Sequence, residues 1–244
     1  MITKLEEFSI NAWPAIQTLL YDGWVFRFAN GYTKRANSVN PLYASTLVLE
    51  EKLVYCESIF QMHELPVVFK LTQSVYPGNL DTQLQARGYR KDSPTSVQVL
   101  DFKSTFVPLP QTAALSEFLS DEWLSAFCRM SAVGDKQRDT LHRMLDNITH
   151  RHCFAAVLVG DKLIACGLGV LQAGSLGLFD IVTDSVYRRQ GFARQIVNTI
   201  LLWGQQNGAG SAYLQVMLNN FPALQLYSTI GFVEKYQYWY RIQS

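Results

Sequence analysis

The sequence predicts a mixed α/β protein in which helices pack on a mixed β-sheet and two related halves follow each other along the chain. Hydrophobic residues make up 48% of the 244 residues and charged residues 17%, so the chain can bury a large core. Segments with strand periodicity alternate with segments of helical periodicity. The order helix, strand, short helix, Gly-aromatic pair and strand occurs twice, with Gly88-Tyr89 in the first half and Gly231-Phe232 in the second. An echo at so long a period indicates duplication.

The first half is predicted to begin with a β-hairpin. Two β-rich runs, 24–29 and 32–39, flank Asn30-Gly31, a dipeptide that favours a type I′ turn. Apolar residues then recur at helical spacing over 44–65, and Pro66 ends that helix. The remaining predicted elements of this half are a buried strand at 66–72, a short helix at 80–87 and an alternating strand at 95–102.

Pro108 and Pro110 indicate a linker, which divides the chain into a first domain, residues 1–107, and a second domain, residues 108–244. Two amphipathic helices are expected next, at 115–130 and 137–148. The elements predicted after them are strands at 154–159, 163–171 and 176–182, a helix at 193–206, a strand at 212–218, a helix at 221–230 and a strand at 235–242.

Charge and cysteine content exclude several classes of protein. Lys plus Arg number 21 against 20 for Asp plus Glu, so no overall field attracts nucleic acid or an anionic membrane. The apolar runs are shorter than the ~20 residues of a membrane span, and the first ten residues lack the zones of a signal peptide. We therefore expect a cytoplasmic protein. The four cysteines lack metal-ligand spacing and are predicted to be core thiols, and no metal is expected.

A basic turn before the helix at 193–206 is the strongest functional signal. The first N–H groups of a helix have no internal acceptor, and the macrodipole is positive there, so a turn that directs these groups at one point binds phosphate. Gly191 lets the backbone approach such a ligand closely, and neighbouring arginines add charge. The predicted phosphate-binding residues are Arg188, Arg189, Gln190, Gly191, Phe192, Ala193 and Arg194.

This turn resembles the (Gln/Arg)-x-x-Gly-x-(Gly/Ala) signature of the GNAT superfamily, the acetyl-CoA-dependent N-acyltransferases. The order of elements over 115–242 is similar to the order in that family. The resemblance implies that the amides of the turn hold the pyrophosphate of CoA and that acetyl-CoA is the co-substrate. It also implies that the end of the preceding strand, at Ile181, Val182 and Thr183, contacts acetyl-CoA.

A second segment, Asn220 to Tyr227, resembles the Asn-x-x-Ala-x-x-Leu-Tyr segment of the same family. The resemblance implies that Asn220 contacts the pantetheine or phosphate arm and that the Tyr227 hydroxyl lies near the thioester sulfur. Because acyl transfer expels a thiolate, a positioned phenol can protonate the sulfur or donate a hydrogen bond to it. Tyr227 is the predicted general acid. Alternatively, Asn220 only caps its helix and Tyr227 is only a core aromatic.

The general base is less clearly marked. The attacking amine must be neutral, and some family members carry a Glu about fourteen residues before the signature glycine. Here that position is Gly177. Asp180, on the same strand, is the remaining candidate, and its direction depends on a β-bulge that the sequence does not reveal. Asp184 is predicted to be a turn residue.

The first half lacks the phosphate turn, and Leu84 stands where the second half has Tyr227. We interpret it as a degenerate half of a tandem GNAT protein that supports the catalytic half. Its hairpin at 26–39 is unusually polar, which fits either a charged sheet edge or a wall of the acceptor site, as in tandem GNAT proteins. In the second interpretation, Arg27, Arg35 and Asn37 bind the acceptor.

Together these patterns predict an N-acetyltransferase that moves an acetyl group from acetyl-CoA directly to a primary amine. The acceptor is a small molecule or a peptide, and its identity stays open, as does the oligomeric state, a homodimer included. One alternative is a non-catalytic acyl-CoA sensor or scaffold. Another is a dinucleotide-binding protein, which the absence of GxGxxG disfavours.

Overall fold

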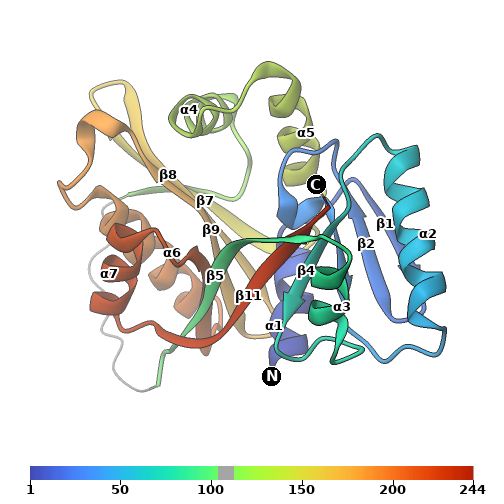
Figure 1. The fold of residues 1–244 in the computed structure, drawn as a ribbon. Helices are drawn as coiled ribbons and strands as arrows, with labels where there is room; N and C mark the ends of the chain where they lie inside the picture. Colours follow the sequence, from blue (N-terminus) through green and yellow to red (C-terminus); the bar gives the residue numbers. More distant parts are fainter. Residues whose placement is uncertain (104–112, 244) are drawn as a thin grey trace.

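The computed structural model of the protein describes residues 1–103 and 113–243. Pro108, Pro110 and the predicted boundary between the two domains lie outside the described residues. Within the described part, one mixed sheet of eleven strands runs through the molecule in the order β1-β2-β3-β4-β11-β5-β10-β9-β8-β7-β6 (Figure 1).

The helices are α1 (Ile2–Ala12), α2 (Leu49–Met62), α3 (Leu80–Ala86), α4 (Asp121–Ser131), α5 (Asp135–Asp146), α6 (Phe192–Gln206) and α7 (Phe221–Ile230), with short 3-10 helices η1 (Lys34–Ala36) and η2 (Ser185–Tyr187). The strands are β1 (Gln17–Tyr21), β2 (Trp24–Phe28), β3 (Ser38–Pro41), β4 (Val68–Thr72), β5 (Arg90–Asp101), β6 (Ala114–Ser116), β7 (Arg151–Val159), β8 (Lys162–Gln172), β9 (Ser175–Thr183), β10 (Ser211–Met217) and β11 (Val233–Ile242).

Most predicted elements are present, and the exceptions lie near the start of each half. The tight hairpin joins β1 to β2 through Asp22-Gly23, both with positive φ, and not β2 to β3 through Asn30-Gly31. The latter pair lies in a longer connection, 29–37, that includes η1. Strand β1 and helix α1 were not predicted. The helix expected to begin at 115 is wrong at its start, because β6 precedes α4 and the Ser120 side chain caps α4.

Strands from the two halves of the chain interleave in the middle of the sheet. Strand β5, from the first half, lies between β11 and β10, and strand β11, from the second half, lies between β4 and β5. Each of these two strands pairs antiparallel with both of its neighbours. The sheet is therefore continuous from β1 to β6, and the strands of each half are completed by one strand from the other half.

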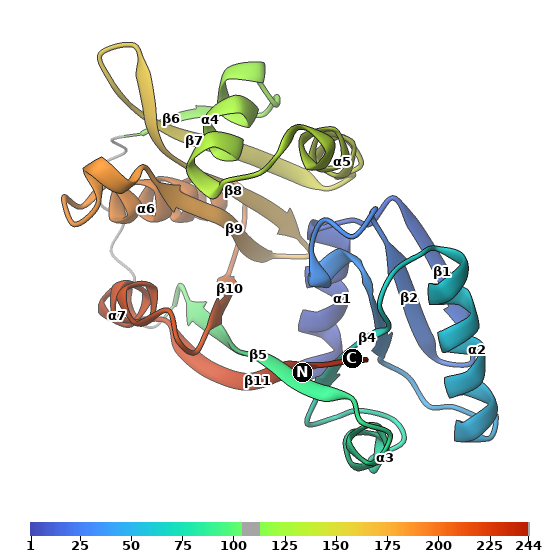
Figure 2. The ribbon, with the colours of Figure 1, turned by 45° about the horizontal axis from the view of Figure 1, so that its top comes forward.

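Helices cover the sheet on both faces, and α4 and α6 lie on opposite sides of β8 and β9 (Figure 2). On the α6 face, Leu176, Leu178 and Ile200 belong to one buried cluster. On the opposite face, a second cluster joins Phe8 of α1 to side chains of α4 and to a row of aromatic residues, Phe179, Tyr213, Tyr236, Tyr238 and Tyr240. The four cysteines are buried and free, as predicted for core thiols.

Two irregularities open the sheet beside α6. The parallel pairing of β9 with β10 ends at Leu178 and Leu214, although both strands continue. Next along β9, the register against β8 shifts between Cys166 and Leu168, so that two residues, Asp180 and Ile181, stand opposite the single residue Gly167. This β-bulge puts Asp180 in a left-handed conformation, with φ 53°. The strands therefore part directly after Leu178.

Gly167 is needed for this packing. A Cβ at this position would lie 2.5 Å from Ile181 Cδ1 and 2.6 Å from Ile196 Cγ2. We expect Gly167→Val to lower the free energy of unfolding by about 1–3 kcal/mol, because overpacking forces neighbouring side chains from their rotamers. Chemical denaturation measures the change. Gly210→Val is the matched control, since nothing lies within 4 Å of a Cβ there, and equal losses in both variants would contradict this account.

Candidate active site

The basic turn forms an open cradle at the start of α6. Gly191 is the N-cap residue of the helix and has φ 87°, a conformation that glycine adopts at little cost. No atom lies within 4 Å of where its Cβ would be. The first N–H groups of α6, at Phe192, Ala193 and Arg194, have no intrahelical acceptor by their position in the helix. They are available to an anionic ligand.

Asp184 fixes the chain just before the cradle. Its carboxylate accepts a hydrogen bond from the Val186 amide, at 3.2 Å, and pairs with Arg129 at 2.7 Å and Lys162 at 3.0 Å. Hydrogen bonds from Lys162 and Arg129 lower the pKa of Asp184 to about 2. This confirms that Asp184 is a turn residue.

A cavity of about 670 Å³ extends from the cradle along β9 and α7. The cavity is lined by most of the residues that were predicted to bind CoA: Ile181, Val182, Thr183, Arg188, Arg189, Gly191, Phe192, Ala193, Arg194 and Asn220. Gln190 is the exception, because its side chain amide donates to the Val186 carbonyl within the turn. The Thr183 hydroxyl is buried with no hydrogen-bond partner among the described residues. The cavity thus offers backbone donors and cations, which suits a phosphate-bearing arm.

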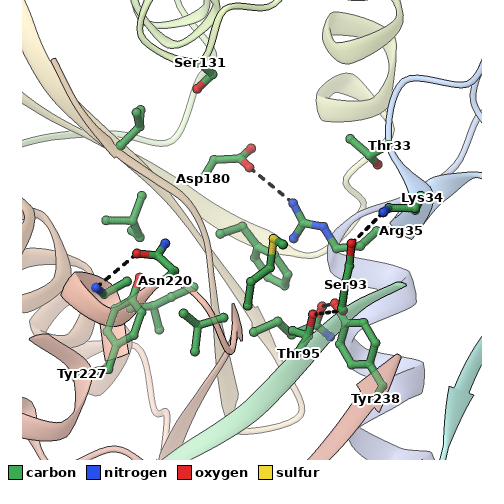
Figure 3. A pocket seen from close by; sticks show the side chains of 18 of the residues that line it. Thr33, Lys34, Arg35, Ser93, Thr95, Ser131, Asp180, Asn220, Tyr227 and Tyr238 are labelled. Atoms are coloured by element: carbon green, nitrogen blue, oxygen red, sulfur yellow. Dashed lines mark hydrogen bonds and ion pairs between the residues drawn. The ribbon is translucent and has the colours of Figure 1, made fainter. Parts of the chain in front are cut away.

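Asn220 and Tyr227 come from the helix α7, on the other side of this cavity. Asn220 caps the helix by accepting a hydrogen bond from the Ala223 amide at 3.3 Å. Figure 3 shows that the side-chain amide of Asn220 also faces the cavity. Tyr227 is 8% exposed and packs edge-on against Phe232, and burial raises the pKa of its hydroxyl to about 12. The phenol is therefore protonated at neutral pH and can donate a hydrogen bond.

A second cavity, of about 460 Å³, lies on the other side of the opening between β9 and β10. Five residues line both cavities: Ile181, Val182, Asn220, Ala223 and Tyr227. The far wall of the second cavity comes from the first half of the chain, through Thr33, Lys34, Arg35, Ser93 and Thr95. A ligand in the first cavity can thus meet a ligand in the second beside Tyr227.

Asp180 lines the second cavity, where the β-bulge turns its side chain toward the first half (Figure 3). The side chain is 6% exposed, one carboxyl oxygen lies 3.7 Å from the Arg35 guanidinium, and the other has no partner among the described residues. Burial raises the pKa of Asp180 to about 7, against the opposing effect of Arg35. The group can therefore take up and release a proton near neutral pH.

The position that carries a Glu in some GNAT proteins has no room for one here. A Cβ on Gly177 would lie 2.5 Å from Phe179 Cε2 and 2.7 Å from the Tyr213 hydroxyl. The packing of these two rings requires glycine at this point in β9. Asp180, three residues later, is the carboxyl group that this strand brings to the cavity.

Of the three predicted acceptor residues, the structure brings only Arg35 to the cavity. Arg27 is 2% exposed, and its guanidinium donates to the carbonyls of Ile10, Trp13 and Arg35. Asn37 accepts hydrogen bonds from the amides of Ala29 and Gly31 and so shapes the loop before η1. The expectation that Arg27 and Asn37 bind the acceptor is corrected, since both are occupied by backbone groups.

Sequence reasoning missed most of the remaining wall. Tyr238 and Tyr240 of β11, with Ser93 and Thr95 of β5, line the second cavity because the two strands interleave. The alternation of tyrosines in YQYWY indicates that one face of β11 is lined with tyrosine rings, but it does not reveal which residues lie opposite that face.

Within residues 1–103 and 113–243, no helix combines the length and apolar character that a membrane span requires.

Comparison with solved structures identifies the fold as that of the GNAT N-acetyltransferases, which use acetyl-CoA. A GCN5-related N-acetyltransferase from Kribbella flavida superposes with a TM-score of 0.73 at 12% identity, covering 99% of this chain and 95% of that one. A tandem GNAT protein from the clavulanic acid biosynthesis pathway superposes with a TM-score of 0.61 at 11% identity, covering 79% of this chain and 69% of that one.

Comparison of the sequence with known families leads to the same class of protein and identifies one family within it. Residues 1–241 match the family described as "Probable histone acetyltransferase Rv0428c C-terminal", and the chain belongs to this family. It is also 27% identical over 252 residues to a Bacillus subtilis protein described as "Uncharacterized N-acetyltransferase YobR", covering 99% of this chain and 98% of that protein. The protein is a GNAT N-acetyltransferase.

The raised pKa of Asp180 predicts how stability depends on pH. Because its folded-state value of about 7 lies above the ordinary 3.8, the stabilisation from this proton is complete below about pH 4 and is lost as the pH rises through 7. We expect the unfolding free energy of the wild type to fall by roughly 2 kcal/mol from pH 5.5 to pH 8.5, relative to that of Asp180→Asn.

Urea denaturation of both proteins at the two pH values measures this difference. Asp161→Asn, in the exposed turn between β7 and β8, is the control and should follow the wild type. If Asp180→Asn differs from the wild type by the same amount at both pH values, the pKa of Asp180 is not raised.

Proposed function

We propose that the protein transfers an acetyl group from acetyl-CoA directly to a primary amine, with the CoA arm in the first cavity and the acceptor in the second. The observation that carries this proposal is the shared wall of the two cavities, at Ile181, Val182 and Tyr227, directly beside Asp180. Two ligands held on either side of this wall react as if within one molecule, which removes most of the entropic cost of their encounter.

The residues of the first cavity fit acetyl-CoA, which supplies the acetyl group as an activated thioester. The first amides of α6, together with Arg188 and Arg194, would hold its phosphates. Arg188 is kept in place by a hydrogen bond to the Thr183 carbonyl, at 3.3 Å, and Arg194 by one to the Thr229 hydroxyl, at 2.6 Å. Asn220 and the strand end at Ile181, Val182 and Thr183 would contact the arm that leads toward Tyr227.

Asp180 and Tyr227 divide the proton chemistry between them. Asp180, ionised above about pH 7, accepts the proton that the amine nitrogen loses as its lone pair forms the new N–C bond. The electron pair of the broken C–S bond remains on sulfur, and the protonated Tyr227 hydroxyl donates a hydrogen bond to it. A buried carboxyl group with a pKa near 7 also counts against a non-catalytic sensor, since that alternative depended on the lack of a base.

The first half of the chain, residues 1–107, is proposed to be a degenerate GNAT-like half that has given up CoA binding and serves as the acceptor wall. Thr33, Lys34 and Arg35 reach the second cavity from it. The acceptor is then a small molecule or a peptide end that fits between the halves.

The cradle is tested by filling it. Gly191→Trp should abolish acetyl-CoA binding measured by calorimetry, because the new side chain occupies the space in front of the α6 amides and is strained at φ 87°. Gly160→Trp is the matched control, since Gly160 also has positive φ and open space but lies in the turn between β7 and β8. Micromolar binding by both variants would exclude the cradle as the phosphate site.

Asp180 is tested by the pH dependence of turnover. We expect kcat/KM to rise as Asp180 loses its proton near pH 7 and to level off above it. Asp180→Asn should lower kcat/KM by about 10²- to 10³-fold and lack this rise. Tyr227→Phe, which retains the ring against Phe232, should lower kcat while keeping the rise. Release of the CoA thiol measures both, and a rise near pH 7 that survives in Asp180→Asn would assign the base elsewhere.

A further inference from the structure

Arg35 brings unused hydrogen-bond donors to the acceptor cavity. A guanidinium carries five N–H donors, yet among the described residues none of those of Arg35 is within hydrogen-bond distance of an acceptor. Its contacts are the ion pair with Asp180, at 3.7 Å, and the face of the Trp13 ring, 4.9 Å from the guanidinium carbon. The side chain is 29% exposed. By contrast, Arg27 and Arg241 each donate several hydrogen bonds.

Arg35 is nevertheless held in position. The Trp13 ring is 1% exposed and supports one face of the guanidinium, and η1 carries the residue itself. A planar cation that lies over an aromatic ring and keeps free donors is suited to bind a carboxylate through two parallel hydrogen bonds.

Asp180 lies beside Arg35, carries the opposite charge when ionised, and also has an unused hydrogen-bonding atom. The second carboxyl oxygen of Asp180 lies in the same cavity and is buried without a hydrogen-bond partner among the described residues. The cavity thus contains a cation and a carboxyl group 3.7 Å apart, each with unmade hydrogen bonds. A buried polar atom normally has a partner, so a ligand is expected to supply one for the Asp180 oxygen. The donors of Arg35, whose side chain is 29% exposed, are open to the same ligand.

We infer that the acceptor is a small amine with a carboxylate on the carbon next to the amino group, that is, an α-amino acid or a close relative. This inference rests on the proposed function. In such a molecule the nitrogen and the carboxyl carbon are about 2.5 Å apart, from standard bond lengths. The carboxylate binds Arg35, and the amino group, which reacts as the neutral amine, faces the Asp180 carboxylate that accepts its proton. Ile181, the residue after Asp180, belongs to the wall that the two cavities share.

The charges of the far wall count against a lysine-rich peptide. Lys34 lines the cavity next to Arg35, where it pairs with Asp92 and donates to the Ser93 hydroxyl at 2.7 Å. A polycationic segment would bring like charges to these two cations. An amine without a carboxylate would leave the donors of Arg35 unpaired, and a site built for a charged group rejects analogues that lack it. The volume of about 460 Å³ suits a small molecule.

The test compares amino acids with the amines that differ from them only by the carboxylate. The full-length protein at saturating acetyl-CoA is assayed for thiol release with tyrosine and tyramine, histidine and histamine, arginine and agmatine, lysine and cadaverine, and a lysine-rich peptide. We expect kcat/KM for at least one amino acid to exceed that of its decarboxylated partner by at least about 100-fold. Mass spectrometry of the product should find the acetyl group on the α-nitrogen.

Arg35→Gln then asks whether Arg35 creates this preference. It should raise KM for the amino acid and reduce the preference over the decarboxylated amine to about threefold or less, and Arg35→Lys should restore part of it. Loss of folding would lower the apparent kcat/KM for the amino acid and for the amine by the same factor and leave the ratio of the two values unchanged. The ratio therefore separates an effect on recognition from an effect on stability. An unchanged ratio in Arg35→Gln would exclude Arg35 as the carboxylate site.

The inference is overturned if no amino acid releases thiol, or if the decarboxylated amines or the peptide react as well as the amino acids. In either case the proposed function stands as long as acetyl-CoA binds the wild type and not Gly191→Trp. If acetyl-CoA does not bind the wild type, the proposed function fails, and the inference fails with it.

Discussion

The β-bulge in β9 is the constraint on which the rest of the site depends. The extra residue opposite Gly167 ends the regular alternation of side chains after Phe179, so that Ile181 returns to the α6 face and Asp180 is turned toward the first half of the chain. The same point marks the end of the pairing between β9 and β10. The bulge and the end of this pairing together open the sheet, and the bulge places a buried carboxyl group at the opening.

The charged groups of the site come from both halves of the chain. The second half supplies the helix start, the arginines and the phenol around the first cavity, while the first half supplies two cations, Lys34 and Arg35, to the second. Asp180 belongs to the second half but has its ion pair with the first. Neither half alone contains both Asp180, whose pKa is raised to about 7, and the Arg35 cation beside it.

The sequence predicted the parts of the site that depend on local structure. The turn around Gly191 and the segment from Asn220 to Tyr227 are each read from consecutive residues, because helix starts and caps are local. The direction of Asp180 was unpredictable, since a bulge is decided by packing against β8 and α6. Arg35, predicted from the polarity of the hairpin, lines the second cavity. Arg27 and Asn37, predicted from the same pattern, instead bond to backbone groups of residues such as Ile10 and Ala29, which the pattern does not reveal. The aromatic wall from β11 required knowledge of strand order.

Interleaving of β5 and β11 has a consequence for how the molecule can be divided. A cut between residues 103 and 113 leaves both fragments with a missing sheet neighbour: the first lacks the strand that belongs beside β4, and the second lacks the strand that belongs between β10 and β11. Each fragment carries the piece that completes the other. The chain is thus a pair of complementing fragments joined covalently, and trimming away the first of them would leave β10 and β11 without the strand that lies between them.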